Sequence, residues 1–241
     1  MNPSDKKYKE KKLQFHKNKI TWDNPIGNYI QGDWDTPHME FQAEITCRSG
    51  GHILEVGFGM GISANHIQKQ NIKSHTIIEL NDEIYNRAVD WAKDKPNTKV
   101  IHGDWKTIEL DEKFDSIFFD AIEQTPTDFV GRLQFPILIL RFCKVGTNVT
   151  MYNHVGFAGE PKTLWSNGTL WTNGLFQDEL IYHKLTLSSE QRNRMLNNND
   201  ETFSKKDKSM YVNDYYLPEW IITEQDTEGK FKKRLNDIHK K

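Results

Sequence analysis

Glycines and acidic side chains in the middle of the chain are spaced as in a cofactor site. Gly57, Gly59 and Gly61 directly follow the apolar run 52–56. Glycines at this place let the backbone turn sharply and approach a bound cofactor closely. Glu79 ends the next apolar run, about twenty residues further on. A carboxylate there can accept hydrogen bonds from both ribose hydroxyls of a nucleoside cofactor, which fits either NAD or S-adenosylmethionine.

The glycine spacing argues against a dinucleotide. The G-x-G-x-x-G pattern needs its third glycine one residue later than Gly61, and position 62 is Ile. The sequence Leu54-Glu-Val-Gly-Phe-Gly-Met-Gly61 instead resembles the glycine motif of class I S-adenosylmethionine-dependent methyltransferases. In that family the loop packs on the methionine part of the cofactor. In that family the adenine of the cofactor lies between a polar or acidic group and an apolar or aromatic side chain. Asp104 and Trp105 stand at the corresponding positions of this sequence.

Alternating strands and helices must position these groups. We expect strands over 52–56, 74–80, 98–102, 114–120 and 147–153, and helices over 61–70, 82–93 and 129–142. Asn81 is a fair N-cap for the second helix. This alternation predicts parallel βαβ units, followed by a closing antiparallel pair formed by strands over 180–187 and 219–224. The predicted fold is α/β: a Rossmann-like class I methyltransferase whose seven-stranded, mostly parallel sheet has a closing antiparallel strand.

The chain divides into three parts. Residues 1–30 form a basic N-terminal arm, and its first nineteen residues are expected to be a solvated helix or a frayed tail. Residues 31–225 form the methyltransferase domain, in which the polar segment 188–214 is an insertion that could act as a lid. Residues 226–241 form a basic C-terminal tail.

A closer resemblance is carried by several short motifs. The sequence Gly32-Asp-Trp-Asp-Thr-Pro-His-Met39 is similar to the W-E-T-P-x-M motif of guanidinoacetate N-methyltransferases and their relatives. The motifs at 54–60, 77–82, 103–105 and 119–120 match the same family, as does Tyr215-Tyr-Leu-Pro218 followed by Ile221-Ile-Thr223. The resemblance covers residues 30–155 and 211–224.

The resemblance implies a set of site residues. Asp35 and Asp120 would face the guanidino group and act as the catalytic carboxylates. Asn153, His154 and Val155 would touch the substrate. The acidic Glu55 and Asp120 are also assigned to the cofactor side, whose remaining predicted residues are Met39, Gly57, Phe58, Gly59, Met60, Gly61, Ile62, Glu79, Leu80, Asn81, Asp104 and Trp105.

Two carboxylates suit this chemistry. A guanidinium is planar and cationic, and it pairs with carboxylates through two parallel hydrogen bonds. Direct methyl transfer needs a nitrogen lone pair, so an aspartate at a strand end can orient that nitrogen and take its proton. Each of the two residues also has an alternative structural role. Asp120 could be a turn residue. Asp35 or Thr36 could cap a helix that has Pro37 at its first position.

The differences from the family lie on the substrate side. Asp35 replaces the family's glutamate, which shortens the side chain by one methylene. Ala121-Ile-Glu-Gln124 stands where the family has T-Y-P, and Gly61 replaces an alanine. We therefore expect an N-methyltransferase with an altered small guanidino or amine substrate. The alternatives are a methyltransferase of the same fold that acts on RNA, protein or another small molecule, and a non-catalytic S-adenosylmethionine-binding module.

Composition adds weak constraints. The formal net charge of -2 does not suggest a nucleic-acid binder. Cys47 and Cys143 form no C-x-x-C motif, and the histidines form no metal motif, so we expect no metal. No signal peptide or membrane span is evident, which predicts a cytoplasmic protein with a small-molecule substrate and no membrane partner. A homodimer is left open.

Overall fold

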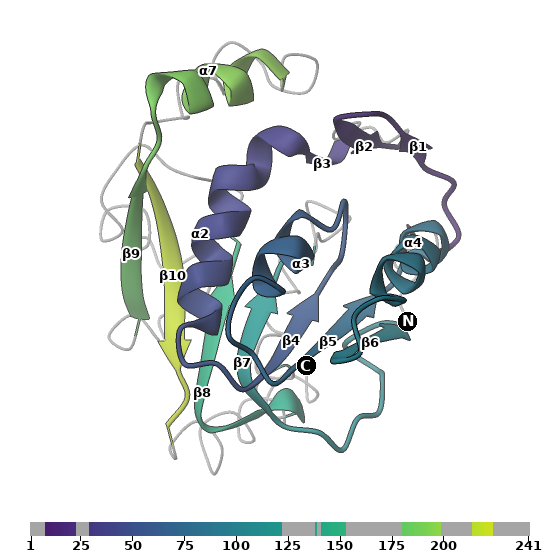
Figure 1. The fold of residues 1–241 in the computed structure, drawn as a ribbon, viewed down its shortest axis with the longest axis vertical. Coiled ribbons are helices and arrows are strands. Elements are labelled where there is room, and N and C mark those ends of the chain that lie inside the picture. Colours follow the sequence, from purple (N-terminus) through teal and green to yellow (C-terminus); the bar gives the residue numbers. More distant parts are fainter. Residues whose placement is uncertain are drawn as a thin grey trace, which may run out of the picture.

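The computed structural model describes residues 8–22, 29–121, 138, 141–152, 180–198 and 214–223. Its central sheet has seven strands in the order β6-β5-β4-β7-β8-β10-β9 (Figure 1). The first five in this order run parallel, and β10 is antiparallel to both β8 and β9. The predicted fold class and its closing antiparallel strand are confirmed. The strands are β4 His52–Val56, β5 Ser74–Glu79, β6 Thr98–His102, β7 Phe114–Phe119, β8 Cys143–Met151, β9 Leu180–Thr186 and β10 Asp214–Ile221.

Three helices cover one face of this sheet (Figure 1). They are α2 Thr36–Cys47, α3 Ile62–Ile67 and α4 Asp82–Ala92, and the short 3-10 turn η1 Asp33–Asp35 precedes α2. The Asn81 side chain accepts hydrogen bonds from the backbone N–H groups of Glu83 and Ile84, which confirms the predicted N-cap of α4. The helix predicted over 61–70 ends earlier, at Ile67. Of the predicted helix 129–142, most residues lie outside the described ones.

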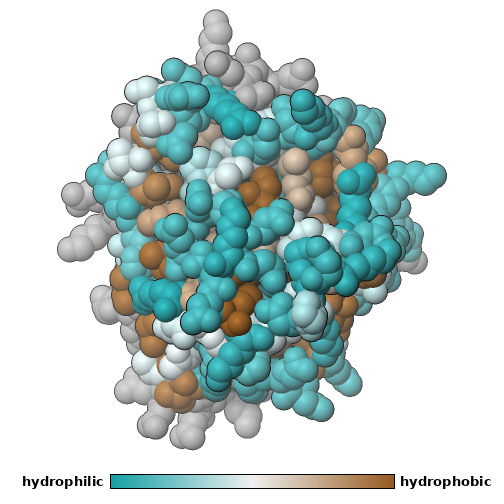
Figure 2. Space-filling model, in the orientation of Figure 1, coloured by the Kyte–Doolittle hydropathy of each residue, from teal (hydrophilic) through white to brown (hydrophobic). Residues whose placement is uncertain are grey.

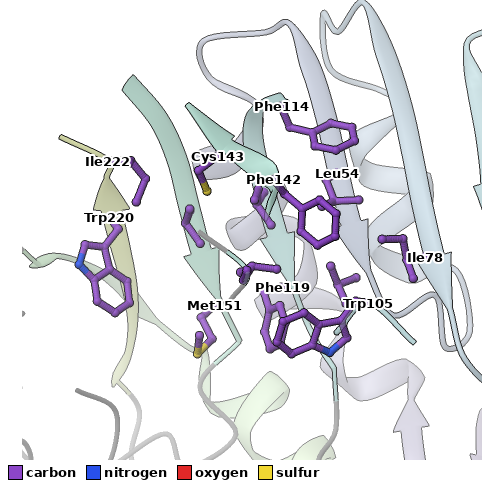
Figure 3. Packing of buried hydrophobic residues seen from close by; sticks show 14 residues of the cluster. Leu54, Ile78, Trp105, Phe114, Phe119, Phe142, Cys143, Met151, Trp220 and Ile222 are labelled. Atoms are coloured by element: carbon purple, nitrogen blue, oxygen red, sulfur yellow. The ribbon is translucent and has the colours of Figure 1, made fainter. Parts of the chain in front are cut away.

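A hydrophobic core fills the opposite face. Trp105 packs edge-on against Phe119, with ring centroids 5.2 Å apart. Leu54 and Val56 of β4, together with Phe142 and Trp220, belong to the same buried cluster (Figure 3). The cluster spans β4, β7, β8 and β10, so it fixes the strands whose ends carry the predicted site.

Strands β5, β7 and β9 end one residue earlier than predicted, and β8 and β10 differ by several residues. β8 begins at Cys143 rather than 147, because the Thr147 hydroxyl bridges Lys144 N–H and Phe114 O across an irregular register. β10 extends back to Asp214 although it contains a proline, which usually argues against a strand. Pro218 is tolerated because β10 pairs with β8 only over Glu219–Ile221.

The described part of the N-terminal arm is folded onto the domain. β1 Gln14–Phe15, β2 Lys19–Thr21 and β3 Tyr29–Gly32 form a small antiparallel sheet. Leu13 and Ile20 are buried and pack in one cluster with Phe58 and Ile84. The expected solvated helix or frayed tail is therefore wrong for residues 8–19.

The polar segment 188–214 contains a helix, α7 Ser189–Asn198. Ser188 and Gln191 form a reciprocal capping box: Ser188 N–H donates to Gln191 Oε1, and Gln191 N–H donates to Ser188 Oγ. The S-x-x-Q pattern at 188–191 could have predicted this helix start.

The visible surface is mostly hydrophilic, with hydrophobic residues in scattered patches (Figure 2). None of the helices in the described ranges is long and apolar enough to cross a membrane.

Candidate functional site

The glycine loop between β4 and α3 is built for close approach. Gly57, Gly59 and Gly61 have φ values of 93°, 54° and 74°, which side-chain-bearing residues rarely adopt. A Cβ at Gly57 would lie 2.6 Å from the backbone oxygen of Asp120, so β4 and β7 meet tightly at this edge. The loop therefore brings its backbone to the point where Asp120 emerges from β7.

Glu79 lies beside this loop at the end of β5. One carboxylate oxygen accepts a hydrogen bond from Phe58 N–H at 2.9 Å, and the other accepts one from Asn81 N–H at 2.8 Å. Burial raises the pKa of Glu79, and the backbone donors partly offset that rise. A carboxylate accepts several hydrogen bonds at once, so Glu79 is the candidate partner for the ribose hydroxyls.

Asp104 and Trp105 follow β6, the neighbour of β5. Asp104 is buried, and its Oδ1 accepts a hydrogen bond from Lys106 N–H. Its Oδ2 has no hydrogen-bond donor among the described residues, and the Lys106 ammonium lies 3.9 Å away. Such a buried acceptor suits an exocyclic amino group, with the Trp105 ring as the adjoining apolar wall.

Asp120 follows β7 directly, at the same edge of the sheet. Burial raises its pKa well above the usual range, and the charges of Asp35, Glu55 and Glu79 raise it further. The structure thus brings both predicted catalytic residues, Asp35 and Asp120, near each other, with Glu79 in the same neighbourhood.

Asp35 ends η1 and is buried. Its Oδ2 accepts a hydrogen bond from Gly32 N–H at 3.1 Å, while Oδ1 has no donor among the described residues. Burial raises its pKa to about 7, the Gly32 bond lowers it, and the charge of Asp33 raises it. Neither Asp35 nor Thr36 caps α2 through its side chain. The Asp35 carboxylate accepts no hydrogen bond from the first turn of α2, and the Thr36 hydroxyl donates to Asp33 O.

Several predicted cofactor residues contribute by packing or through the backbone. Met39 is buried among core residues of α2 and β4. Phe58 packs against Trp91, with ring centroids 5.4 Å apart, so it reaches the site through its N–H. Glu55 accepts a hydrogen bond from Ser63 and lies 2.8 Å from His75 Nε2, inside the fold.

Two residues near the site were not predicted. Tyr8 lies close enough to Glu79 and Asp120 that their charges add to the burial that raises its pKa. Gln31 of β3 accepts a hydrogen bond from Met60 N–H in the glycine loop at 2.6 Å. The sequence does contain a sign of the N-terminal strands near these two residues: Leu13 and Phe15, like Ile20 and Trp22, alternate with polar residues as strands do.

Asn81 and the remaining predicted loop residues lie at the same edge of the sheet. Asn81 is fully buried after β5, and its side-chain nitrogen donates to Tyr8 O and Lys11 O. Leu80, Met60 and Ile62 are partly buried around the same edge. The predicted substrate residues Asn153, His154 and Val155 lie outside the described residues.

Comparison with known proteins assigns the chain to a family. The family model described as guanidinoacetate N-methyltransferase matches residues 3–167, more than half of the chain. The chain belongs to the guanidinoacetate N-methyltransferase family. Family and fold together make it an S-adenosylmethionine-dependent methyltransferase, as the resemblance predicted.

The guanidinoacetate N-methyltransferase family assignment is accompanied by more distant relatives. Protein arginine N-methyltransferase 2 of Candida glabrata is 32% identical over 111 residues, covering 43% of this chain and 26% of that protein. The same enzyme of Aspergillus oryzae is 28% identical over 134 residues, covering 52% and 32%. The chain thus spans about a third or less of the length of these curated relatives.

Solved structures support the fold. N-methyltransferase NodS from Bradyrhizobium japonicum WM9 is similar with a TM-score of 0.52 at 13% identity, covering 79% of this chain and 97% of that chain. A spermidine synthase gives 0.51 at 11% identity, covering 90% and 76%. At these identities the likeness shows the class I methyltransferase fold alone.

The residues present fit S-adenosylmethionine. The glycines let the loop backbone pack closely against its neighbours at the ligand-binding edge. Asp104 Oδ2 offers a buried acceptor without a hydrogen-bond donor among the described residues. Glu79 would accept the ribose hydroxyls, and the Trp105 ring would lie against the adenine. The Asn81 side chain is occupied by the α4 cap and the N-terminal backbone, so it would support this edge indirectly. When bound, the cofactor supplies an electrophilic methyl group on a sulfonium.

Proposed function

We propose that this protein is an N-methyltransferase that acts on a small guanidino or amine compound, with Asp35 and Asp120 binding the cationic acceptor. The observation that carries the proposal is that Asp35 and Glu79, both buried, lie near enough to Asp120 for their charges to raise its pKa. A bound cation offsets these negative charges and favours the deprotonated forms. The site's own electrostatics therefore favour a positively charged acceptor.

Each carboxylate has a separate part in the proposal. Asp35 offers the oxygen that accepts no hydrogen bond from the described residues, so it can take an N–H of the acceptor. Asp120 follows the strand beside the glycine loop, where it can orient the reacting nitrogen. Binding of the cation displaces the proton of Asp120, and the resulting carboxylate, whose pKa is raised, is a stronger base than an ordinary aspartate. It can then take the proton that the nitrogen loses.

A thermal-shift panel tests the acceptor class. The protein is saturated with S-adenosylhomocysteine, and guanidinoacetate, other guanidino compounds and primary amines are then added singly. Ureidoacetate, in which a neutral urea group replaces the guanidinium of guanidinoacetate, and a short arginine-containing peptide complete the panel. A ligand that binds the native state stabilises it and so raises the melting temperature. At a ligand concentration of a hundred times Kd, the free energy of unfolding rises by about 2.7 kcal/mol.

We expect a further rise with at least one small guanidino or amine compound and none with ureidoacetate. Asp120→Asn should keep the response to S-adenosylhomocysteine and lose the response to the cation. Asp111→Asn, at an exposed carboxylate, should keep both. An equal rise with ureidoacetate, or a rise with the peptide alone, would contradict the proposal.

A further inference from the structure

Helix α7 lies at the ligand-binding edge of the sheet. Because β10 is antiparallel to both β8 and β9, strand β9 ends at the same edge as β7 and β8. α7 begins three residues after β9 ends and lies above the start of α2 (Figure 1). Ligands in open parallel sheets bind at this edge. α7 is therefore placed beside the acceptor side rather than on a remote surface.

Three residues join α7 to the turn η1, and we call them the α7 clamp: Leu187, Arg194 and Met195. Leu187 and Met195 are buried against Trp34. Arg194 forms an ion pair with Asp33, with 2.7 Å between Nη2 and Oδ2. The ion pair is partly exposed and contributes little stability by itself, so the apolar contacts supply most of the attachment and the ion pair fixes its direction.

Contacts continue from the clamp to Asp35. A Cβ at Gly32 would overlap the Trp34 ring, so that ring lies directly against the Gly32 backbone. Gly32 N–H in turn donates the hydrogen bond that holds the Asp35 carboxylate. The clamp residues, Trp34, Gly32 and Asp35 thus form one continuous series of contacts.

We propose that α7 positions the acceptor-binding carboxylate: the α7 clamp holds η1 and keeps Asp35 directed toward the site that it shares with Asp120. The inference rests on the proposed function for the role of Asp35. Leu187, Arg194 and Met195 are positioning residues, because their contacts reach the acceptor through Trp34 and Gly32. Helix α7 lies outside residues 3–167, over which the family model matches the chain.

The first measurement needs no acceptor. Hydrogen exchange at the Gly32 amide reports the bond to Asp35, and it should accelerate about tenfold in Met195→Ala and about threefold in Arg194→Ala. Asn193→Ala, at an exposed position on the same helix, is the matched control and should leave it unchanged. Unchanged exchange in Met195→Ala and Arg194→Ala would overturn the inference, whatever the acceptor proves to be.

The second measurement uses the acceptor that the panel identifies. In Arg194→Ala the acceptor KM should rise about fivefold or more with kcat nearly unchanged, and the affinity for S-adenosylhomocysteine should stay as in the wild type. Exchanging the charges, with Asp33→Arg and Arg194→Asp together, should restore the KM. If no small acceptor is found, the proposed function fails while the exchange experiment still decides the role of α7. Faster exchange with an unchanged acceptor KM would also overturn the inference.

Discussion

The Asp35 side chain is buried although only one of its oxygens has a hydrogen-bond donor among the described residues. Such a carboxylate should weaken the fold in exchange for a binding function. Its pKa is raised from 3.8 to about 7. Between these values the unfolded chain loses its proton while the folded protein keeps it, so stability falls as pH rises through this window. The loss above pH 7 is at most about 4 kcal/mol.

Asp35→Asn should remove this pH dependence. The variant keeps an oxygen for Gly32 N–H and carries no charge, so it should gain stability relative to the wild type between pH 4 and pH 8. Urea unfolding at several pH values measures the difference, with Asp111→Asn as the exposed control. If the free energy of unfolding changes with pH in the same way in the wild type and in Asp35→Asn, the burial of Asp35 does not destabilise the fold.

Residues next to strand ends could be predicted from the sequence. Asp120 and Asp104 each follow an apolar run, and parallel strands bring their carboxyl ends to one edge. Tyr8 could not be placed in this way, because it reaches Glu79 and Asp120 through contacts between parts of the chain far apart in sequence. Met39 is buried among core residues, and its contact with the cofactor stays a prediction, because a motif match does not tell which way a helical side chain points.

At the scale of elements, the glycine loop should tolerate no side chain at Gly57. Gly57→Ala would require a strained φ of 93° and push against the Asp120 backbone. We expect the affinity for S-adenosylhomocysteine to fall about tenfold or more, as measured by calorimetric titration. Gly146→Ala is the matched control: its φ is 86°, but a Cβ there meets nothing within 4 Å. It should lose about 1 kcal/mol of stability and keep the affinity. Equal affinity losses in both variants would mean that strain alone is responsible.

The Asn81 side chain links two elements. Its oxygen caps α4, and its nitrogen bonds the backbone of the N-terminal segment at Tyr8 and Lys11. Asn81→Ala should lower the free energy of unfolding by about 2–3 kcal/mol, because it removes a cap and leaves buried groups unsatisfied. Asn86→Ala, exposed on the same helix, should change it little. A loss of similar size in the two variants would contradict this linking role.

The alternating elements of the central sheet followed from periodicity, and strands β4 and β6 have the predicted bounds. The N-terminal strands were missed although they alternate in the same way, because their lysines dominate the composition and only a few apolar residues, such as Leu13 and Ile20, supply the packing. α7 has mostly polar residues, and its burial depends on Met195 and on Leu187 just before it, so periodicity alone gave little indication of it.

At the scale of the whole molecule, the chain is nearly neutral but its site is acidic. Asp35, Glu79 and Asp120 all have raised pKa values, with burial as the main cause in each. A cation should therefore bind more tightly as pH rises from 6 to 8, because its binding displaces protons from these carboxyl groups.

Calorimetric titration in two buffers of different ionisation enthalpy measures those protons. With the S-adenosylhomocysteine-loaded protein, a guanidino or amine ligand from the panel should release protons near pH 7, and ureidoacetate should bind weakly at every pH. An affinity that is independent of pH, with no proton release, would contradict the acidic site.

The most direct test of the central claim is methyl transfer itself. The wild type, Asp120→Asn and Asp111→Asn are incubated with methyl-labelled S-adenosylmethionine and each compound of the panel, and the labelled product is identified by mass spectrometry. We predict label on a nitrogen of a small guanidino or amine compound, a rate about a hundredfold or more lower in Asp120→Asn, and a normal rate in Asp111→Asn. No labelled small compound, or an undiminished rate in Asp120→Asn, would contradict the account.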